Sequence, residues 1–271
     1  MSNIFYNIIF LVFFSLISIF TYASDRSIII QSTTSLKNSG FYDYILPIIL
    51  NDTGIKAKIV AVGSGAAIRN SMNCDGDILI VHSPKKEKNF VSAGYTNTNH
   101  YLMHNHFIII GPKNDPANIK KFNDPYKAFK KIFNLQKYFI SRGDKSGTHD
   151  KELQIWKELS VNPTAYSGKW YLETGSSMGA TINIAIGLGG YTLTDKATWI
   201  KFSNKKDFIV MVEDNKSLIN LYSIMAVSRN KCPNVKENDS NRFISWLLSE
   251  KGRIKISKFK ADGKKLFYVD K

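Results

Sequence analysis

Short apolar runs alternate with amphipathic stretches in the first part of the chain, and this pattern predicts strands that alternate with helices. Buried strands are expected at 27–31, 55–62 and 77–82. Helices are expected up to Leu50, over 66–72 and from Pro84, and Gly54 is well placed as a C-terminal cap of the first. A strand–helix–strand–helix–strand order predicts a parallel sheet flanked by helices.

The rest of the chain has a different character, because two long apolar runs, 101–111 and 221–228, bracket a mixed segment. Inside that segment the pattern predicts helices near 124–133, 151–159 and 178–186, and strands at 138–140 and 190–194. Asp195 is expected to cap a further helix, and two helices are expected near the C-terminus, over 239–249 and 251–259. Two long strands around a middle segment predict a chain that crosses twice between two lobes.

The first 23 residues contain no Lys, Arg, Asp or Glu, and an apolar run extends from 8 to 20. The run ends in Thr21-Tyr22-Ala23, a small-x-Ala pattern. We interpret this segment as a secretory signal peptide that is cleaved after Ala23. The alternative is an uncleaved anchor, although the apolar run is short for a membrane span. Export would place the mature protein in the periplasm.

Composition narrows the classes of function. The 271 residues are 44% hydrophobic, which is enough for one large or two modest cores. A net charge of +15 is compatible with nucleic-acid binding, but the basic residues are scattered and no aromatic-rich nucleic-acid motif occurs. We therefore expect no nucleic-acid partner. No cluster has metal-ligand spacing, and the sequence leaves open whether Cys74 and Cys232 pair.

The loop Ser141-Arg142-Gly143-Asp144-Lys145-Ser146-Gly147-Thr148 lies between a predicted strand and a predicted helix. It combines an arginine fork, hydroxyls, glycines and the free backbone N–H groups of a helix start, which together suit a small oxyanion. The alternative is a polar turn with a solvated arginine. Two similar loops, 32–35 and 63–65, follow the first two predicted strands. Ligands of such sheets bind beyond the carboxyl ends of the strands, where these loops lie.

Several of these stretches carry a resemblance to a known family. They are Ser-Thr-Thr-Ser at 32–35, Val-Gly-Ser-Gly-Ala at 62–66, Ser-Arg-Gly-Asp-x-Ser-Gly-Thr-His at 141–149 and Tyr-Thr-Leu-Thr-Asp at 191–195. Together they resemble the tungstate-binding periplasmic proteins of tungstate-specific ABC transporters, over about 28–267. Ser32 departs from the pattern, since the family usually has a further threonine there.

The resemblance implies an α/β, two-lobed periplasmic-binding-protein fold of type II topology, in which each lobe is a mixed sheet flanked by helices. The first lobe would comprise residues 24–104 and 223–271, and the second 105–222. The ligand, tungstate or molybdate, would lie in the cleft between the lobes, with no cofactor. The protein would be a monomer that delivers the oxyanion to a membrane permease of an ABC importer, and not an enzyme.

The expected ligand residues are those of the three loops and one further helix start. They are Thr33, Thr34, Ser35, Ser64, Gly65, Arg142, Ser146, Gly147, Thr148 and Met178. Tungstate is a dianion with four acceptor oxygens and no donor. Three helix N-termini and Arg142 would roughly offset its charge, and charge-assisted hydrogen bonds would supply the rest.

Each of these assignments has an alternative. Any single Ser or Thr can serve only to cap its helix, and Arg142 can pair with Asp144 instead. We interpret His82 and His149 as structural. Two other functions remain open: an oxyanion-sensing subunit with the same site, or an enzyme on the same fold. The Gly-Asp-x-Ser-Gly string faintly resembles a serine-protease nucleophile loop, but the sequence offers no partner set for it.

Overall fold

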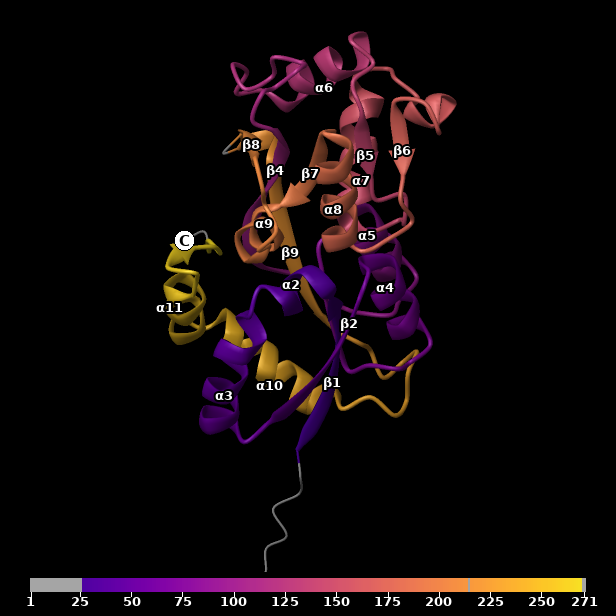
Figure 1. Ribbon diagram of the computed structural model, residues 1–271. Helices are drawn as coiled ribbons and strands as arrows, with labels where there is room; N and C mark the ends of the chain where they lie inside the picture. The colour runs from indigo at the N-terminus through magenta and orange to yellow at the C-terminus, as the bar shows by residue number, and fades with distance from the viewer. Residues whose placement is uncertain (1–25, 214, 270–271) are drawn as a thin grey trace, which may run out of the picture.

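The computed structural model describes residues 26–213 and 215–269 of the chain. The signal peptide predicted at residues 1–23 lies outside these described residues. Within the described part, no helix has both the length and the apolar character needed to cross a membrane. Figure 1 shows two stacked parts that are joined by long strands.

The beginning of the chain forms the predicted alternation of strands and helices. Its elements are β1 (Ser27–Thr33), α2 (Thr34–Asn38), α3 (Phe41–Thr53), β2 (Lys56–Val62), α4 (Ser64–Met72), β3 (Ile78–Val81) and α5 (Pro84–Ser92). β1 pairs in parallel with β2 on one side and with β3 on the other. All four residues of β3 are buried, as expected for a strand covered by helices on both faces. The predicted parallel unit is therefore confirmed.

Two long strands, β4 (His100–Pro112) and β9 (Ile219–Ala226), connect the two parts of the molecule (Figure 1). β9 runs antiparallel to β3 and also to the first half of β4. The second half of β4 pairs instead with β7 (Thr192–Asp195) and β8 (Phe208–Val212), both antiparallel. One sheet in the order β2-β1-β3-β9-β4-β7 therefore extends through both parts, and the chain crosses between them twice, as predicted.

The segment between β4 and β9 builds the second part. Its further elements are α6 (Pro125–Asn134), β5 (Phe139–Ser141), α7 (Gly147–Glu158), a 3-10 turn (Pro163–Tyr166), β6 (Tyr171–Glu173), α8 (Met178–Leu188), α9 (Lys196–Lys201) and a second 3-10 turn (Lys216–Leu218). Aromatic side chains fill its core, where the ring centroids of Phe129 and Trp156 are 4.5 Å apart. This core is separate from that of the first part, so we use the term second lobe for α6–α8 with β5–β8.

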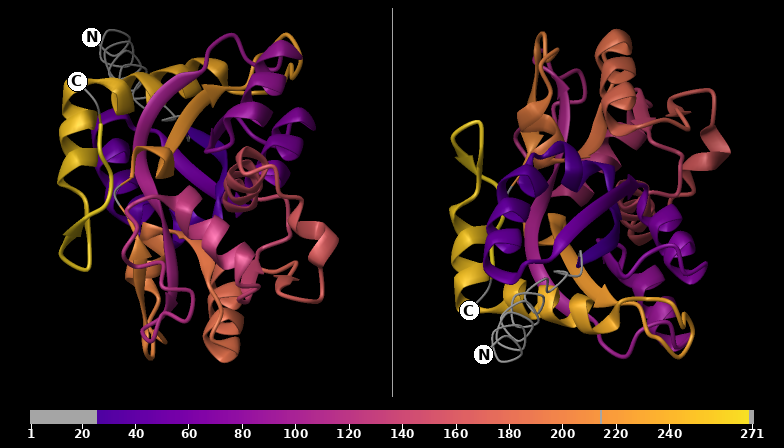
Figure 2. Two further views of the ribbon diagram at one scale, coloured as in Figure 1. Left: turned by 90° about the horizontal axis from the view of Figure 1, so that it is seen from above. Right: turned by 90° about the horizontal axis from the view of Figure 1, so that it is seen from below.

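The chain returns to the first part through α10 (Glu237–Leu248) and α11 (Glu250–Lys258), followed by the hairpin β10 (Lys260–Ala261) and β11 (Lys264–Lys265). Phe243, Leu247 and Phe267 pack in one cluster with Ile28 of β1. Figure 2 shows both C-terminal helices against this part of the molecule. We use the term first lobe for β1–α5 together with α10 and α11. Ala197 of α9 packs in the same cluster, so α9 contacts the first lobe.

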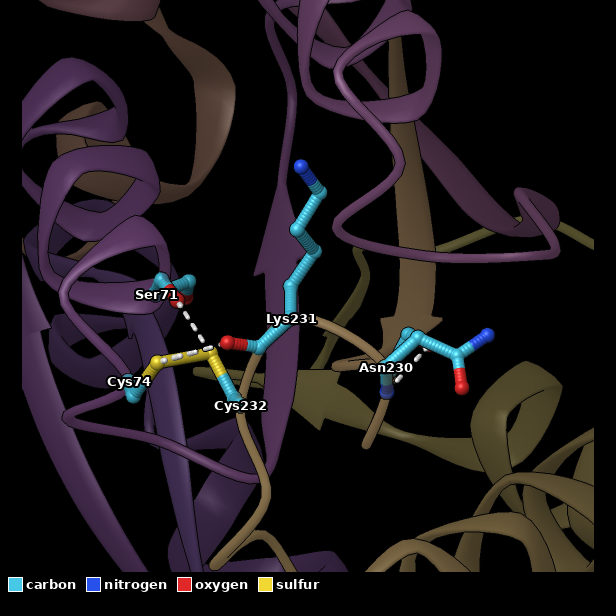
Figure 3. Close-up of a disulfide and its surroundings, with 6 residues drawn as sticks. Ser71, Cys74, Asn230, Lys231 and Cys232 are labelled. Atoms are coloured by element: carbon cyan, nitrogen blue, oxygen red, sulfur yellow. Dashed lines mark hydrogen bonds between the residues drawn. A yellow bond between two sulfur atoms is a disulfide. The ribbon is translucent and has the colours of Figure 1, made fainter.

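Cys74, just beyond the end of α4, forms a disulfide with Cys232 (Figure 3). The two cysteines are 158 positions apart in sequence, which is why spacing alone did not reveal the pairing. The bond ties the loop after α4 to the segment that follows β9. It therefore fixes the far end of a helix whose first turn, as described below, contributes to the candidate site.

The main departures from the predicted elements have local causes. α7 begins at Gly147, four residues before the predicted start, because Ser146 accepts a hydrogen bond from the His149 N–H and caps the helix there. The predicted helix up to Leu50 is two helices, because Gly40 takes a left-handed φ of 81° between them. Gly54 ends the second with a φ of 71°, as predicted. β6 and β8 were not predicted.

Candidate functional site

Residues from the three predicted loops line a single small pocket between the lobes. Its volume is about 10 Å³, close to the least space that holds one water molecule. The residues of the first lobe that line it, which we call the first wall, are Thr33, Thr34, Ser35, Val62, Gly63, Ser64 and His82. The residues of the second lobe, which we call the second wall, are Arg142, Ser146, Gly147 and Thr148. Eight of the ten predicted ligand residues are thus brought together.

The first wall is made where β1 and β2 end and α2 and α4 begin. Thr33 is the N-cap of α2, and its Oγ1 accepts from the Leu36 N–H at 3.3 Å. The hydroxyls of Thr33 and Ser35 are 3.2 Å apart. The first turn of α2 is therefore partly satisfied by its own side chains.

The start of α4 is different, because Gly63 is its N-cap and offers no side-chain oxygen to the first turn. Ser64, the first helical residue, is 1% exposed. Ser64 lines the pocket, and its buried Oγ has no hydrogen-bond partner among the described residues. A buried hydroxyl without a partner costs free energy, so Ser64 is suited to a group that enters the pocket.

His82 completes the first wall, although sequence reasoning took it as structural. It follows β3 directly and is 6% exposed. Its ring lies near Tyr222, with centroids 4.8 Å apart. Nδ1 is buried without a partner in the described part of the chain. Burial lowers the pKa of His82 to about 4, so the imidazole is neutral at pH 7. A single histidine at the end of a predicted strand gives little indication in the sequence that it will line a pocket.

Arg142 carries the positive charge of the second wall and is only 8% exposed. Its Nη2 forms an ion pair with Asp144, and its Nε donates to the Ser176 carbonyl at 3.3 Å. Burial lowers the pKa of Arg142, whereas the carboxylates of Asp144 and Asp195 oppose that shift. The sequence left open whether Arg142 contacts a ligand or pairs with Asp144. In the structure Arg142 pairs with Asp144 and also lines the pocket.

The first turn of α7 supplies the rest of the second wall. Ser146 caps it, and Gly147 and Thr148 are its first two residues, so their N–H groups belong to the set without intrahelical acceptors. Gly147 is required sterically, because a Cβ there would lie 2.5 Å from the Cε1 atom of His82. The two walls therefore touch at this glycine, and a larger residue would push them apart.

A buried carboxyl lies behind the second wall. Glu152 accepts hydrogen bonds from Ser141 Oγ at 2.6 Å and Tyr171 Oη at 2.7 Å. Ser141 Oγ in turn accepts from the Gly143 N–H at 3.2 Å. Burial raises the pKa of Glu152 to about 7. This network holds the backbone on both sides of Arg142.

Gly65 and Met178 are not among the residues that line the pocket. Gly65 is the second residue of α4 and lies beside the Lys145 carbonyl. Met178 packs in an apolar cluster at the start of α8, two residues after the Ser176 carbonyl to which Arg142 donates. A direct role of these two backbones in binding stays a prediction.

Contacts between α5 and α7 join the lobes beside the pocket. Lys86 Nζ donates to Asp150 at 2.7 Å and to the Lys145 carbonyl at 2.7 Å. Ser83 Oγ donates to the same carboxylate at 2.8 Å. The side chains of Lys86 and Asp150 are about one third exposed, so their ion pair contributes little by itself. Together they connect the rims of the two walls.

The chemistry of the pocket follows from what lines it. Its walls carry hydroxyls, helix-start N–H groups, one guanidinium and one neutral imidazole, and none of its lining residues in the described chain is Asp or Glu. Asp144 lies outside the pocket, where it pairs with Arg142 and accepts from the Ser146 N–H. Asp195 caps α9, as predicted, through the Thr198 N–H at 2.9 Å. Such a pocket suits an anion that has many acceptors and no donor.

The two lobes, the crossing strands and the interlobe pocket define the class of periplasmic binding proteins. A family model described as a PBP superfamily domain matches residues 21–251, so the chain belongs to that superfamily. The predicted fold class is confirmed.

Relatives narrow the family further. The tungstate-binding protein TupA of Peptoclostridium acidaminophilum is 39% identical over 86% of this chain and 81% of its own length. The structure of TupA from Desulfovibrio alaskensis G20, also named as tungstate binding, matches with a TM-score of 0.79 and 40% identity, over 89% of this chain and 98% of that one. A structure described as the tungstate ABC transporter from Geobacter sulfurreducens matches with a TM-score of 0.78 and 38% identity, over 86% and 98%. This chain belongs to the TupA family, which confirms the resemblance stated from the sequence.

Proposed function

We propose that this protein binds tungstate, or the closely similar molybdate, in the pocket between its lobes. The observation that carries the proposal is the pocket lining, which offers donors from both lobes and, among the described residues, no carboxylate. The buried Ser64 Oγ, which has no partner in the described chain, supports it. Relatives that share 38–40% of their residues with this chain are named for tungstate.

The energetics are consistent with a dianion. Removing such an ion from water costs several kcal/mol, even after the protein relaxes. The first turns of α4 and α7 each carry about half a positive charge. Arg142 adds a full charge that Asp144 partly offsets. Hydrogen bonds to a charged group contribute about 1.5–3 kcal/mol each, so four or five of them outweigh the remaining cost.

The two lobes supply the means of capture. At about 10 Å³ the pocket has room for about one water molecule, so we infer that the walls separate to admit the larger oxyanion and then close around it. The contacts of Lys86 with Asp150 and with the Lys145 carbonyl would form on closure. We propose that the closed monomer then docks on the membrane permease of an ABC importer. The Cys74–Cys232 disulfide is typical of an oxidising compartment, which supports a periplasmic location reached through the predicted signal peptide.

A binding role fits the pocket better than catalysis. A nucleophilic hydroxyl would be hydrogen-bonded to a base, yet Ser64 Oγ and His82 Nδ1 are both unpartnered within the described residues, so they are not bonded to each other. We propose a protein that is not an enzyme and needs no cofactor.

Calorimetric titration of the mature protein with tungstate, molybdate, sulfate and phosphate tests this function. We expect one site per chain, with tight binding of tungstate and molybdate. Sulfate should bind weakly, because the smaller ion cannot reach all donors at once and leaves some unsatisfied. Phosphate should hardly bind, because its proton would face donors only.

Competition decides the donor-only character of the site. Phosphate should fail to displace bound tungstate at comparable concentration. Displacement at comparable concentration would show an acceptor in the pocket and would overturn the tungstate function.

A further inference from the structure

His149 is a buried residue of the second lobe that belongs neither to the expected ligand set nor to the pocket lining. It is the third residue of α7, and its backbone N–H donates to the Oγ of Ser146, which caps the helix. Its side chain reaches back past the cap, where Nδ1 accepts a hydrogen bond from the Lys145 N–H at 3.0 Å. This arrangement resembles a capping box. The backbone and the side chain of His149 therefore hold two successive residues of the loop before α7.

The residue held by this ring has an uncommon backbone conformation. Lys145 has a φ of 60°, in the left-handed region that residues other than glycine seldom adopt. Its N–H is bonded to His149, and its carbonyl accepts from Lys86 Nζ at 2.7 Å. Lys86 belongs to α5 of the first lobe. The backbone of Lys145 is therefore held on one side from within its own lobe and on the other side from across the pocket.

The same hydrogen bond defines the state of the ring. A backbone N–H can only donate, so Nδ1 of His149 carries a lone pair, and the neutral ring has its hydrogen on Nε2. Nε2 is buried and has no partner among the described residues, so no contact there opposes this tautomer. Burial lowers the pKa of His149. Lys86 acts in the same direction, whereas three carboxylates oppose the shift, those of Asp144, Asp150 and Glu173. The ring is therefore a neutral acceptor at pH 7.5.

We propose that His149 is a positioning residue for closure of the lobes, which presents the Lys145 carbonyl to Lys86 by accepting a hydrogen bond from the Lys145 N–H. The proposal rests on the proposed function and deepens it, because it identifies a contact that keeps the captured oxyanion in the pocket. The N–H and the carbonyl flank one Cα, so a fixed N–H and a fixed φ leave only ψ to direct the carbonyl. The contact with Lys86 crosses between the lobes and acts on the closed state. His149 therefore slows release of the ligand more than it speeds capture.

The first test compares His149→Leu with His149→Asn. The dissociation rate is measured with radiolabelled tungstate that is chased with excess unlabelled tungstate. Leucine has no acceptor, so the Lys145 N–H loses its partner, and we expect dissociation to become about 10-fold faster. Oδ1 of asparagine, like Nδ1 of histidine, is bonded to Cγ, so His149→Asn should restore most of the wild-type rate.

Three outcomes of this comparison would be decisive. A wild-type dissociation rate in His149→Leu would overturn the inference while leaving the proposed function in place. An asparagine variant that releases tungstate as fast as the leucine variant would also overturn it. Failure of wild type to bind tungstate would overturn both the inference and the proposed function.

A control separates the backbone of Lys145 from its side chain. Lys145→Ala keeps the N–H and the carbonyl, so its dissociation rate should be that of wild type. Loss of the exposed charge should act on the association rate instead. Dissociation from Lys145→Ala as fast as from His149→Leu would show that the side chain is responsible and would overturn the inference.

A double-mutant cycle separates positioning from a general effect on α7. If His149 acts through the Lys145 carbonyl, Lys86→Ala should accelerate dissociation less in His149→Leu than in wild type, by about 3-fold or more. Ser83→Ala is the matched control, because Ser83 Oγ also crosses to α7 but donates to Asp150 at 2.8 Å. Its effect should be the same in both backgrounds. An equal effect of Lys86→Ala in both backgrounds would overturn the inference.

Nitrogen NMR tests the acceptor role of the ring without a substitution in the protein that is measured. Wild type is labelled at histidine, and His149→Asn serves only to assign the signal. In the tungstate complex at pH 7.5 we expect Nδ1 of His149 to be bare and Nε2 to carry the hydrogen. A hydrogen on Nδ1 would overturn the inference.

Discussion

The two walls of the pocket satisfy their polar groups in different ways. On the second wall, Arg142 is bound to Asp144 and Ser176, and Ser146 caps α7. On the first wall, Ser64 Oγ and His82 Nδ1 have no partner among the described residues. Ser64 and His82 are as buried as Arg142 and Ser146, so the difference does not come from access to water.

This difference separates two contributions to binding. The second wall provides charge that is already held in place, so little ordering is needed when a ligand arrives. The first wall holds unsatisfied buried groups, which cost stability until an acceptor enters. Substitutions on both walls should therefore lower the affinity for the ligand, but they should differ in their effect on the stability of the protein without ligand.

The largest expected effect is at Arg142. Arg142→Ala should weaken tungstate binding by about 2–5 kcal/mol, because it removes a buried charged donor and leaves Asp144 uncompensated beside the pocket. Calorimetry gives the affinity and thermal unfolding gives the stability. Arg69→Ala, at an exposed position of α4 outside the pocket, is the matched control and should bind as wild type does.

A double variant separates the two parts of that loss. Arg142→Ala with Asp144→Asn removes the repulsion as well as the donor, and should recover a fraction of the affinity. Binding of Arg142→Ala as tight as that of wild type would show that the second wall does not contact the anion.

Ser64 tests the first wall. Ser64→Ala should weaken tungstate binding by about 1.5–3 kcal/mol, because a hydrogen bond to a charged ligand is lost. The apo protein should be as stable as wild type or slightly more stable, because a buried hydroxyl without a partner is removed. Ser71→Ala is the control, since Ser71 Oγ in the same helix is also buried without a partner in the described chain but lies outside the pocket. It should change stability in the same direction without changing affinity, and a drop in stability for Ser64→Ala without loss of affinity would contradict this account.

Each wall also has a buried titratable group, and their effects on stability have opposite signs. Burial raises the pKa of Glu152, behind the second wall, from 4.5 to about 7. Its contribution to stability is full below pH 4.5 and is lost as the pH rises to about 7. Burial lowers the pKa of His82 from 6.5 to about 4, so its contribution is full above pH 6.5 and is lost as the pH falls to about 4.

We expect two opposite changes relative to wild type, each on the order of 2 kcal/mol in the free energy of unfolding. Glu152→Gln should gain stability relative to wild type as the pH rises from 4.5 to 7. His82→Asn should gain it as the pH falls from 6.5 to 4. Denaturant unfolding across this pH range measures the free energy of unfolding of both variants relative to wild type. If this difference changed with pH in the same direction for both variants, the predicted opposite signs would be wrong.

The smallest expected effect is at Ser146, the counterpart of Ser64 on the second wall. Its Oγ accepts from the His149 N–H at 3.3 Å, and its hydroxyl hydrogen remains for a ligand. Ser146→Ala should therefore lower stability by about 1 kcal/mol through loss of the cap and also weaken binding. Thermal unfolding with and without tungstate separates the two effects, and unchanged apo stability would show that the cap is not needed.

The sequence predicted the fold well where periodicity and caps agree. The apolar runs of β1, β3 and β9, the cap at Gly54 and the cap at Asp195 all follow from local patterns. The start of α7 did not, because Gly147 to Asp150 are polar or small and only the Ser146 cap marks the helix. The short strand β6 owes its position to its pairing with β5 across the chain, which no local pattern reveals.

The site was predicted in its loops but not in full. Hydroxyls and glycines at helix starts have a recognisable local chemistry, so Ser64, Arg142 and Thr148 could be named in advance. His82 could not, because its place on the pocket depends on the fold, which brings its ring against Gly147 of the other lobe. Distant contacts also decided the Cys74–Cys232 pairing.

A crystal structure of the tungstate complex tests the central claim most directly, because tungsten can be located by its anomalous scattering. We predict a single tungsten position between the two walls, with its oxygens accepting hydrogen bonds from Arg142 and Thr148 on one side and from Ser64 on the other. A tungsten position outside this pocket, or one that contacts only one wall, would contradict the account.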